Sequence, residues 1–210
     1  MTSTPAPWQL GFVCTANICR SAYADVRARS ILEGIPGSLQ VHSAGIYGHT
    51  GASIDTEMGR EAVARGADIS SFLARRVTRA FISESDLVLT AEAGHRTFIL
   101  EEWPMTLGKV FTFAQFVEGI DRVEEDLHGE ALVAEIRRKL PPAQATGNIP
   151  DPYQRGDVAA EECANLIDSY LWRILPRLVP SSSRTTPSSH RPAAGEHLRA
   201  QTRRSEAEPR

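Results

Sequence analysis

Short apolar runs alternate with segments of helical periodicity along the first half of the chain, and this alternation is what most restricts its fold. The runs with the length and composition of buried strands are 8–13, 39–44, 87–90 and 109–113. Helical spacing marks residues 22–33, which end before Gly34, and 54–65, which end before Gly66. Strands that alternate with helices form right-handed βαβ units. The predicted fold class is therefore an α/β three-layer sandwich with a four-stranded parallel sheet and helices on both faces.

The second half of the chain predicts further helices on either side of one loop. Residues 114–140 are helical in composition and end at Pro141 and Pro142. Residues 149–156 (IPDPYQRG) are typical of a loop that two prolines hold. A closing helix is predicted at 157–178 from apolar residues at three- and four-residue spacing, which are Cys163, Leu166, Ile167, Tyr170, Leu171, Ile174, Leu175 and Leu178. This stripe should pack on the sheet.

Composition separates the end of the chain from the rest. Residues 181–210 contain one Leu and no aromatic residue, Ile, Val or Met, so they cannot bury enough apolar area to offset their ordering entropy. We expect a single domain at 1–180 and a disordered tail at 181–210. The net charge of the chain is −3, but the tail carries six Arg against three Glu, which leaves 17 basic and 23 acidic residues in 1–180. An acidic body argues against a nucleic-acid partner.

Several other classes are excluded by what the sequence lacks. No apolar run approaches the roughly 20 residues that cross a bilayer, and the first residues do not have the pattern of a signal peptide, so we expect a cytoplasmic protein without a membrane partner. Three cysteines are too few for a disulfide scaffold, and six scattered His give no metal site. Any cysteine chemistry is expected to be that of a reduced thiol.

The segment 14–21 (CTANICRS) lies where the first predicted strand meets the first predicted helix. In a parallel sheet this is the edge where ligands bind. Backbone N–H groups of such a loop, with the free donors of the helix N-terminus, form an anion site, and Arg20 can clamp two phosphate oxygens. The same positive field favours the thiolate form of Cys14, and the Ser21 hydroxyl could donate a hydrogen bond to it. A nucleophile, an oxyanion cradle and a charge clamp would then share one turn.

Simpler interpretations stay open for each of these residues. Cys-x5-Arg pairs also arise by chance, and Cys14 could be a small buried residue at a strand end. Asp151 lies between Pro150 and Pro152, where a turn Asp is common. A carboxyl on a stiff loop near the cradle could equally donate a proton to a leaving group. Taken together, the loop with Cys14 and the loop with Asp151 favour a catalytic site.

Three motifs, in this order, resemble the low-molecular-weight protein tyrosine phosphatases. They are VCTANICRS at 13–21, SAG at 43–45 after the second strand, and DPY at 151–153 before the last helix. The resemblance extends over about 9–178 and includes DISSFLAR at 68–75, SDLVLT at 85–90 and EAGHR at 92–96. It implies that residues 1–180 form a phosphatase domain.

The resemblance also assigns roles within the loop. It implies that Cys14 is the nucleophile, Arg20 the phosphate clamp, Ser21 the partner of the thiolate and Asp151 the general acid. The residues implied to bind the phosphate are Thr15, Ala16, Asn17, Ile18, Cys19, Arg20 and Ser21.

Two further residues are implied to brace the loop by hydrogen bonds, Asn17 and Ser43. The sequence departs from the family pattern nearby, since the family usually has Gly where Ala16 stands and Pro where Ala22 stands, and commonly His where Phe72 stands. Ala16 lacks the freedom of glycine at positive φ, and Phe72 cannot form a hydrogen bond to Asn17. These departures bear on the stiffness of the loop's support and, through it, on turnover.

The implied reaction is hydrolysis of phosphotyrosine, and of aryl phosphomonoesters generally, through a phosphocysteine. No metal or cofactor is required, because Arg20 and the loop amides stabilise the phosphoryl oxygens. Tyr153 could form an aromatic wall of the pocket, as could Tyr47, although both also suit surface packing. The implied partners are phosphotyrosine-containing proteins, with a tyrosine kinase as one candidate.

Two other functions fit parts of the same pattern. Thioredoxin-coupled arsenate reductases have a similar loop but use two further cysteines near the third strand, and residues 83–96 contain none. A reductase coupled to a small thiol needs only the loop Cys and stays open. A non-catalytic phosphate-binding module is the third alternative, although binding alone would require neither Cys14 nor Asp151.

The remaining cysteines have separate expectations. Cys19 is either a buried filler beneath the loop or a resolving thiol that captures oxidised Cys14 as a disulfide. Other members of the resembled family have a second Cys here, which favours the redox role. Cys163 lies on the apolar stripe of the last predicted helix, so a role in the core is expected.

Overall fold

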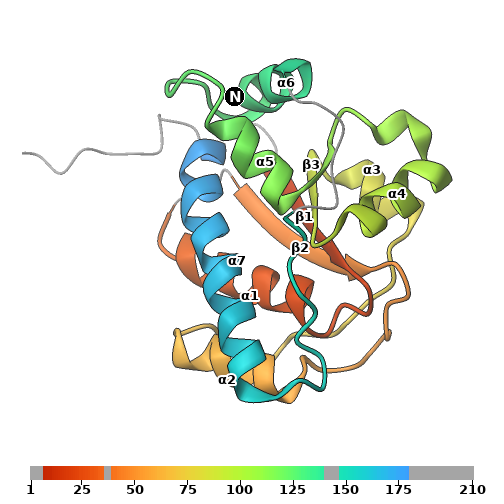
Figure 1. Cartoon of the computed structure of the whole chain (residues 1–210), viewed down its shortest axis with the longest axis vertical. Coiled ribbons are helices and arrows are strands. Elements are labelled where there is room, and N and C mark those ends of the chain that lie inside the picture. Colours follow the sequence, from red (N-terminus) through yellow and green to blue (C-terminus); the bar gives the residue numbers. More distant parts are fainter. Residues whose placement is uncertain (1–6, 36–38, 140–146, 180–210) are drawn as a thin grey trace, which may run out of the picture.

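The computed structural model describes residues 7–35, 39–139 and 147–179, and it has a parallel sheet at its centre with strand order β2-β1-β3-β4 (Figure 1). The strands are β1 (Trp8–Cys14), β2 (Leu39–Gly45), β3 (Leu87–Thr90) and β4 (Val110–Thr112). The helices are α1 (Arg20–Leu32), α2 (Thr56–Ala64), α3 (Arg79–Glu84), α4 (Ala93–Glu102), the 3-10 turn η1 (Pro104–Thr106), α5 (Phe113–Ile120), α6 (Gly129–Lys139) and α7 (Gly156–Leu178). The expected tail and the paired prolines at 141–142 lie outside the described residues.

All four strands that the apolar runs predict are present, and the predicted fold class is confirmed. The central strand, β1, pairs in parallel with β2 on one side and with β3 on the other, and β3 pairs with β4. Side chains of β1 alternate between the two faces, so that Leu10 and Phe12 join one buried cluster and Val13 joins the other. Every residue of β3 is buried, as expected for a strand covered on both sides.

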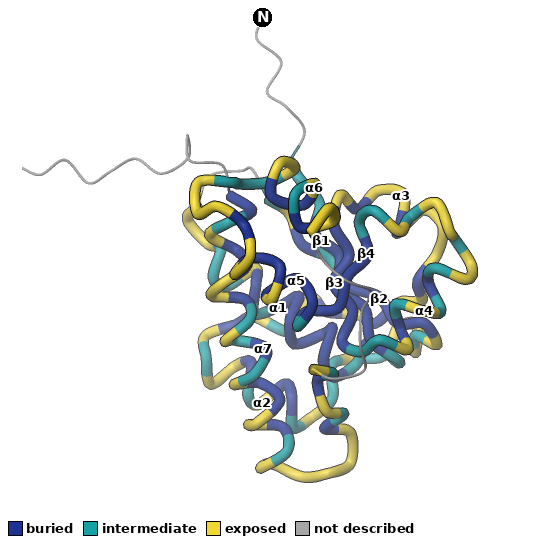
Figure 2. Tube along the Cα trace, turned by 45° about the horizontal axis from the view of Figure 1, so that its top comes forward, coloured by how far each residue is buried: buried dark blue, intermediate teal, exposed yellow. Residues whose placement is uncertain are grey.

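Helices cover both faces of the sheet. The larger cluster joins Phe12 to residues of α1, α5 and α7, and Figure 1 shows these helices together on one side, with α3 and α4 on the other. The smaller cluster joins Val88 of β3 to Phe81 of α3 and Ile99 of α4. In Figure 2 the strands and the inward sides of the helices are the buried part of the chain. The sheet is therefore the middle layer of three.

The segment that is helical in composition, 114–140, contains two helices with a turn between them. The helix α5 ends at Ile120, and α6 begins at Gly129 after a turn. Backbone carbonyls of this turn are taken by a side chain of α7, since Arg177 donates from Nη2 to Glu124 O (2.7 Å) and from Nε to Leu127 O (3.1 Å). The turn is thus bound by a residue some 50 positions away, a contact that the local sequence does not reveal.

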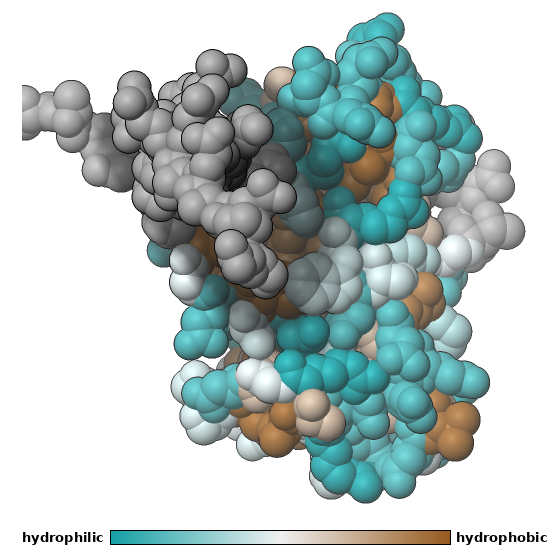
Figure 3. All heavy atoms as spheres, turned by 90° about the vertical axis from the view of Figure 1, so that its left-hand side faces the viewer, coloured by the Kyte–Doolittle hydropathy of each residue, from teal (hydrophilic) through white to brown (hydrophobic). Residues whose placement is uncertain are grey.

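The last helix, α7, is amphipathic as predicted. Its buried residues include Cys163, Ile167, Leu171, Ile174, Leu175 and Leu178. Its outer side belongs to the face drawn in Figure 3, where the visible described residues are mostly hydrophilic, with apolar side chains in separate patches. Within the described residues, no helix is long and apolar enough to cross a membrane.

Candidate active site

The loop between β1 and α1 is held from behind by the segment that follows β2. Carbonyl oxygens of Cys14, Thr15, Ala16 and Ile18 each accept a hydrogen bond from a backbone N–H of residues 46–55, at 2.8–3.0 Å. Within the described chain, by contrast, no backbone N–H of residues 15–19 is used in such a bond. Because these four carbonyls are occupied and the amides are left free, the loop has the character of an anion cradle.

The turn depends on Asn17, which adopts a left-handed backbone conformation with φ of 59°. Its side chain is completely buried and donates from Nδ2 to Ser21 Oγ and to Ser43 Oγ, both at 2.9 Å. Its Oδ1 accepts from the backbone N–H of Arg75 at 2.9 Å. Asn is one of the few residues that tolerates this conformation, and these three bonds stabilise it.

The two departures from the family pattern that bear on this turn are both accommodated. Ala16 is not among the described residues with positive φ, so it does not need the freedom of glycine. Phe72 makes no hydrogen bond to Asn17, but the backbone N–H of Arg75 occupies the side-chain oxygen of Asn17. The amide of Asn17 is therefore fully oriented without a histidine.

Cys14 lies at the floor of the cradle, at the end of β1. Its Sγ is 3.0 Å from Ser21 Oγ. Ser21 is on the first turn of α1 and also receives the hydrogen bond from Asn17. A hydroxyl in this position can donate to a thiolate and stabilise it, both in the resting enzyme and as a leaving group.

Arg20 is the first residue of α1 and its side chain is 2% exposed. Nη1 pairs with Glu92 and donates to Ile149 O (3.1 Å), while Nη2 donates to Thr15 Oγ1 (3.3 Å) and lies 3.4 Å from Asp151 Oδ2. The Nε atom is buried and has no partner among the described residues. A phosphate oxygen would supply the hydrogen bond that this buried N–H lacks.

The charge of Arg20 is secured by its neighbours. Burial alone would favour the neutral form, but Cys14, Glu92 and Asp151 together raise the pKa of Arg20 above its ordinary value. The guanidinium is therefore a permanent cation beside the sulfur.

The loop at 147–156 brings Asp151 to the cradle from far along the chain. It is anchored by two bonds to the segment after β3, from Ile149 N to Ala91 O (2.9 Å) and from Ala93 N to Asn148 Oδ1 (2.9 Å). The Asp151 side chain is 45% exposed. A partly exposed carboxyl at the rim can donate a proton to a leaving group and then take one from an entering water.

These residues enclose a cavity of about 210 Å³, lined by Cys14, Thr15, Ala16, Ile18, Cys19, Arg20, His49, Asp151 and Tyr153. Tyr153 is therefore at the rim, whereas Tyr47 packs edge-on against Phe98 and is not one of the lining residues. Cys19 is buried in the wall. Burial, Asp55 and Cys14 all raise the pKa of the Cys19 thiol, so it stays protonated at neutral pH.

Sequence reasoning missed two polar residues beside the cradle, Glu92 and His95. Glu92 pairs with Arg20, and His95 Nε2 lies 2.9 Å from Thr15 Oγ1. Burial lowers the pKa of His95 to about 4, so the ring is neutral at pH 7. A signal was present, because both follow β3, whose carboxyl end lies at the same sheet edge as Cys14.

No metal centre is found within the described part of the chain, where no three His, Cys, Asp or Glu side chains are grouped to hold an ion. The third cysteine, Cys163, is buried on α7, and burial raises its pKa to about 12. The groups that line the site are thus the Cys14 thiol, the Cys19 thiol in the wall, Arg20 and Asp151, around a loop of free amides.

Comparisons with known proteins give the class of enzyme to which this site belongs. Residues 9–130 match the family described as low molecular weight phosphotyrosine protein phosphatase. A low molecular weight protein-tyrosine-phosphatase of Acinetobacter johnsonii is 27% identical over 157 residues, covering 75% of this chain and 88% of the relative. A protein-arginine-phosphatase of Geobacillus stearothermophilus is 34% identical over 124 residues, covering 55% of this chain and 75% of the relative.

Solved structures share the fold. A low molecular weight protein tyrosine phosphatase from T. tengcongensis superposes with a TM-score of 0.65 at 22% identity, covering 81% of this chain and 99% of that one. The YwlE arginine phosphatase from Geobacillus stearothermophilus gives 0.64 at 22% identity, covering 81% and 92%. The fold and the matched relatives define a cysteine-dependent phosphatase. The chain belongs to the low molecular weight phosphotyrosine protein phosphatase family.

Gly45, the last residue of β2, generates a first prediction about the cradle. A Cβ added there would lie 2.6 Å from Thr15 O and 2.8 Å from Ala16 C and Asn17 N, all of which are backbone atoms. Because the loop would have to move, we expect Gly45→Ala to lower the free energy of unfolding by about 2 kcal/mol or more. We also expect it to reduce kcat by a larger factor than other destabilising variants do, as measured by urea unfolding and aryl phosphate hydrolysis.

Gly94→Ala is the matched control. A Cβ at Gly94, in the first turn of α4, meets nothing within 4 Å, so its stability and kcat should stay within error of the parent protein or improve slightly. Equal behaviour of the two variants would show that the loop does not rest on Gly45.

Proposed function

We propose that this protein hydrolyses phosphotyrosine through a phosphocysteine intermediate on Cys14. The observation that carries the proposal is the joint placement of a thiol 3.0 Å from a serine hydroxyl and of a buried guanidinium whose Nε has no partner. The first group suits a nucleophile and leaving group, and the second suits a phosphoryl oxygen. Membership in a phosphatase family is consistent with both.

The reaction consists of two displacements at phosphorus. The Cys14 thiolate attacks phosphorus in line, the bond from phosphorus to the tyrosine oxygen breaks, and Asp151 donates its proton to that oxygen. Water then attacks the phosphocysteine while Asp151 takes a proton from it, and the S–P bond breaks to release phosphate and the thiolate. Throughout, Arg20 and the loop amides stabilise the charge on the phosphoryl oxygens, and Ser21 stabilises the sulfur anion.

The cavity favours an aryl substrate over phosphoarginine, which a relative's name suggests as the second candidate. Its lining includes Ile18, His49 and Tyr153, whose aliphatic and aromatic side chains suit contact with a flat ring. A guanidinium would need a carboxylate to receive its N–H groups. Asp151 is the one carboxylate lining the cavity in the described chain, and it is assigned to proton transfer.

A paired assay tests this assignment. We expect the protein to release phosphate from a phosphotyrosine peptide with a kcat/KM at least tenfold above that for the same peptide carrying phosphoarginine, and to show no thiol-dependent reduction of arsenate. Cys14→Ser should abolish hydrolysis but still bind vanadate, because the amides and Arg20 remain. A preference for phosphoarginine would reverse the substrate assignment, and activity in Cys14→Ser would end the nucleophile assignment.

We also propose that Cys19 protects the nucleophile by forming a disulfide with oxidised Cys14. Both thiols are free, both are buried, and both line the same cavity. Peroxide oxidises the Cys14 thiolate to a sulfenic acid. The Cys19 sulfur would then attack the Cys14 sulfur, the S–O bond would break, and the hydroxyl would leave as water with the Cys19 proton. The bond requires the two Cα atoms to lie within about 7 Å, which a tightly curled loop favours.

Peroxide treatment tests the protective role. The parent protein should regain most of its activity when a thiol reductant is added, whereas Cys19→Ala should be active beforehand but recover far less. Cys163→Ala is the control, because this thiol lies in the core, and it should recover as the parent does. Equal recovery in all three proteins, without a Cys14–Cys19 disulfide in a mapped digest, would return Cys19 to a packing role.

The setting of the reaction follows from this chemistry. A thiolate nucleophile works where thiols stay reduced, so we place the protein in the cytoplasm. Its partners are then phosphotyrosine-containing proteins, for which a tyrosine kinase is a candidate.

A further inference from the structure

A chain of hydrogen bonds runs from the nucleophile to the far side of α1. Its links are Cys14 Sγ to Ser21 Oγ (3.0 Å), Asn17 Nδ2 to Ser21 Oγ (2.9 Å), Asn17 Nδ2 to Ser43 Oγ (2.9 Å), Ser43 Oγ to Asp25 Oδ2 (2.8 Å) and Arg29 Nε to Asp25 Oδ1 (2.7 Å). We propose that Asp25, held as a carboxylate by Arg29, is a positioning residue that accepts the Ser43 hydrogen bond and, together with the Arg75 N–H on Asn17, fixes the direction of this chain so that the Ser21 hydroxyl points at the sulfur. The inference rests on the proposed role of Cys14 as nucleophile.

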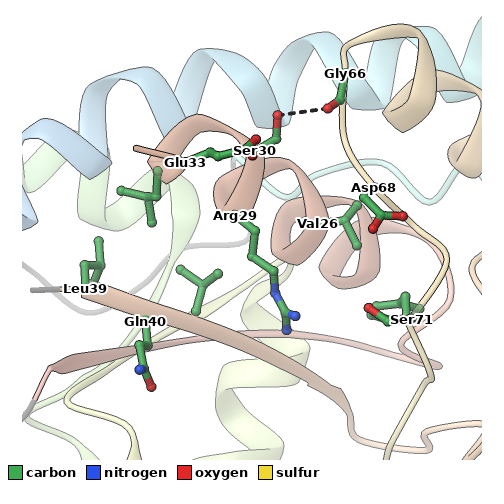
Figure 4. A pocket seen from close by; sticks show the side chains of 12 residues that line it. Val26, Arg29, Ser30, Glu33, Leu39, Gln40, Gly66, Asp68 and Ser71 are labelled. Atoms are coloured by element: carbon green, nitrogen blue, oxygen red, sulfur yellow. Dashed lines mark hydrogen bonds between the residues drawn. The ribbon is translucent and has the colours of Figure 1, made fainter. Parts of the chain in front are cut away.

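The outer end of the chain lies in a groove away from the active site. Asp25 is buried on α1, with its side chain 3% exposed, whereas Arg29, one turn further along, is 55% exposed. Arg29 lines a groove of about 580 Å³ between α1, β2 and residues 66–72, and Figure 4 shows its side chain extending from α1 toward β2. The Asp25 carboxylate thus contacts Arg29 on the solvent side and Ser43 on the side of the loop.

The direction of each bond follows from which groups can donate. An arginine only donates and a carboxylate only accepts, so Ser43 must give its hydroxyl proton to Asp25. The oxygen of Ser43 is then free to accept from the Asn17 amide, which donates its second N–H to Ser21. Since the Ser21 oxygen already accepts a hydrogen bond from Asn17, its own O–H is available to donate to the sulfur, with the carbonyl of Ala44 at 3.3 Å as the alternative acceptor.

The opposite direction is blocked at Asn17. The side-chain oxygen of Asn17 accepts from the backbone N–H of Arg75, so the amide cannot turn over without losing that bond. Ser43 therefore has to accept from Asn17, and its proton needs another acceptor. Asp25 is that acceptor, and an uncharged partner that offered a donor instead would oppose Asn17.

Arg29 keeps Asp25 in the charged form that this direction requires. Burial raises the pKa of Asp25, and the charge of Arg29 is the largest influence that opposes it. The hydrogen bond from Ser43 and the charge of Arg75, on the segment after α2, act in the same direction as Arg29. Without Arg29, a protonated Asp25 could donate to Ser43 and reverse the first link of the chain.

The test measures both the reactivity of the Cys14 sulfur toward an alkylating agent and the turnover of substrate. In Asp25→Asn, Arg29 would hold the amide oxygen and the amide N–H would face Ser43. We expect the pH midpoint of Cys14 alkylation by iodoacetate to rise, and kcat for an aryl phosphate to fall about tenfold, roughly the effect of one hydrogen bond. KM should change less than twofold, because the amides and Arg20 are untouched. Arg29→Ala should shift both quantities in the same direction, and Arg29→Lys should restore most of the loss.

A matched control and a double variant separate positioning from simple destabilisation. Arg122→Ala also removes an exposed arginine that pairs with an acid four residues away, Glu118, and it should leave the alkylation midpoint unchanged. In a Ser43→Ala background, where the link is already broken, Asp25→Asn should add little. If Asp25→Asn does not fold, the alkylation midpoint of Arg29→Ala alone tests the proposal.

The inference is overturned if the folded variants keep the parent alkylation midpoint, or if the Asp25 and Ser43 effects add in full. Because alkylation needs no phosphorylated substrate, a shifted midpoint would support the inference even if phosphotyrosine proved not to be the substrate.

Discussion

The buried guanidinium of Arg20 is the contact on which the rest of the site depends. It joins three parts of the chain that are distant in sequence, since it binds Thr15 in the loop, Glu92 after β3 and both Ile149 and Asp151 in the loop before α7. A charge buried this deeply is tolerated only when its partners are complete, and removing one leaves the others uncompensated. The remaining donor, Nε, has no partner in the described chain. Arg20 therefore assembles the site, and we propose that its free donor binds the phosphoryl group.

The cradle around it is stiffened by packing and polar contacts that do not follow the usual family pattern. Asn17 takes the left-handed conformation itself, and the backbone of Arg75 replaces the histidine that the family commonly uses. Gly45 allows β2 to approach the back of the loop at a distance that a side chain would prevent. Phe72 instead lines the groove on the far side of α1, next to Arg29. The loop is therefore still supported where the sequence departs from the family pattern, but by other residues.

Much of the fold could be predicted because its signals are local. The strands are short apolar runs, and the stripe on α7 shows in the spacing of its apolar residues. The motif around Cys14 also has a local signature at the junction of a strand and a helix. Glu92, His95 and Asp25 have no such local signature, because their contacts with Arg20, Thr15 and Ser43 join residues that are distant in sequence. The turn after α5 is bound by Arg177 from far along the chain, and α4 has no clear apolar stripe because only His95 and Ile99 of that helix are buried.

The most direct test of the account is to trap the intermediate it requires. Asp151→Asn should slow hydrolysis of the phosphocysteine while leaving its formation from p-nitrophenyl phosphate, a good leaving group, much less affected. Rapid acid quenching followed by mass spectrometry should then find phosphate on Cys14, at close to one per protein, and none in the Cys14→Ser variant. A full complement of unmodified Cys14 during steady turnover, or phosphate on another residue, would contradict the assignment of Cys14 as nucleophile.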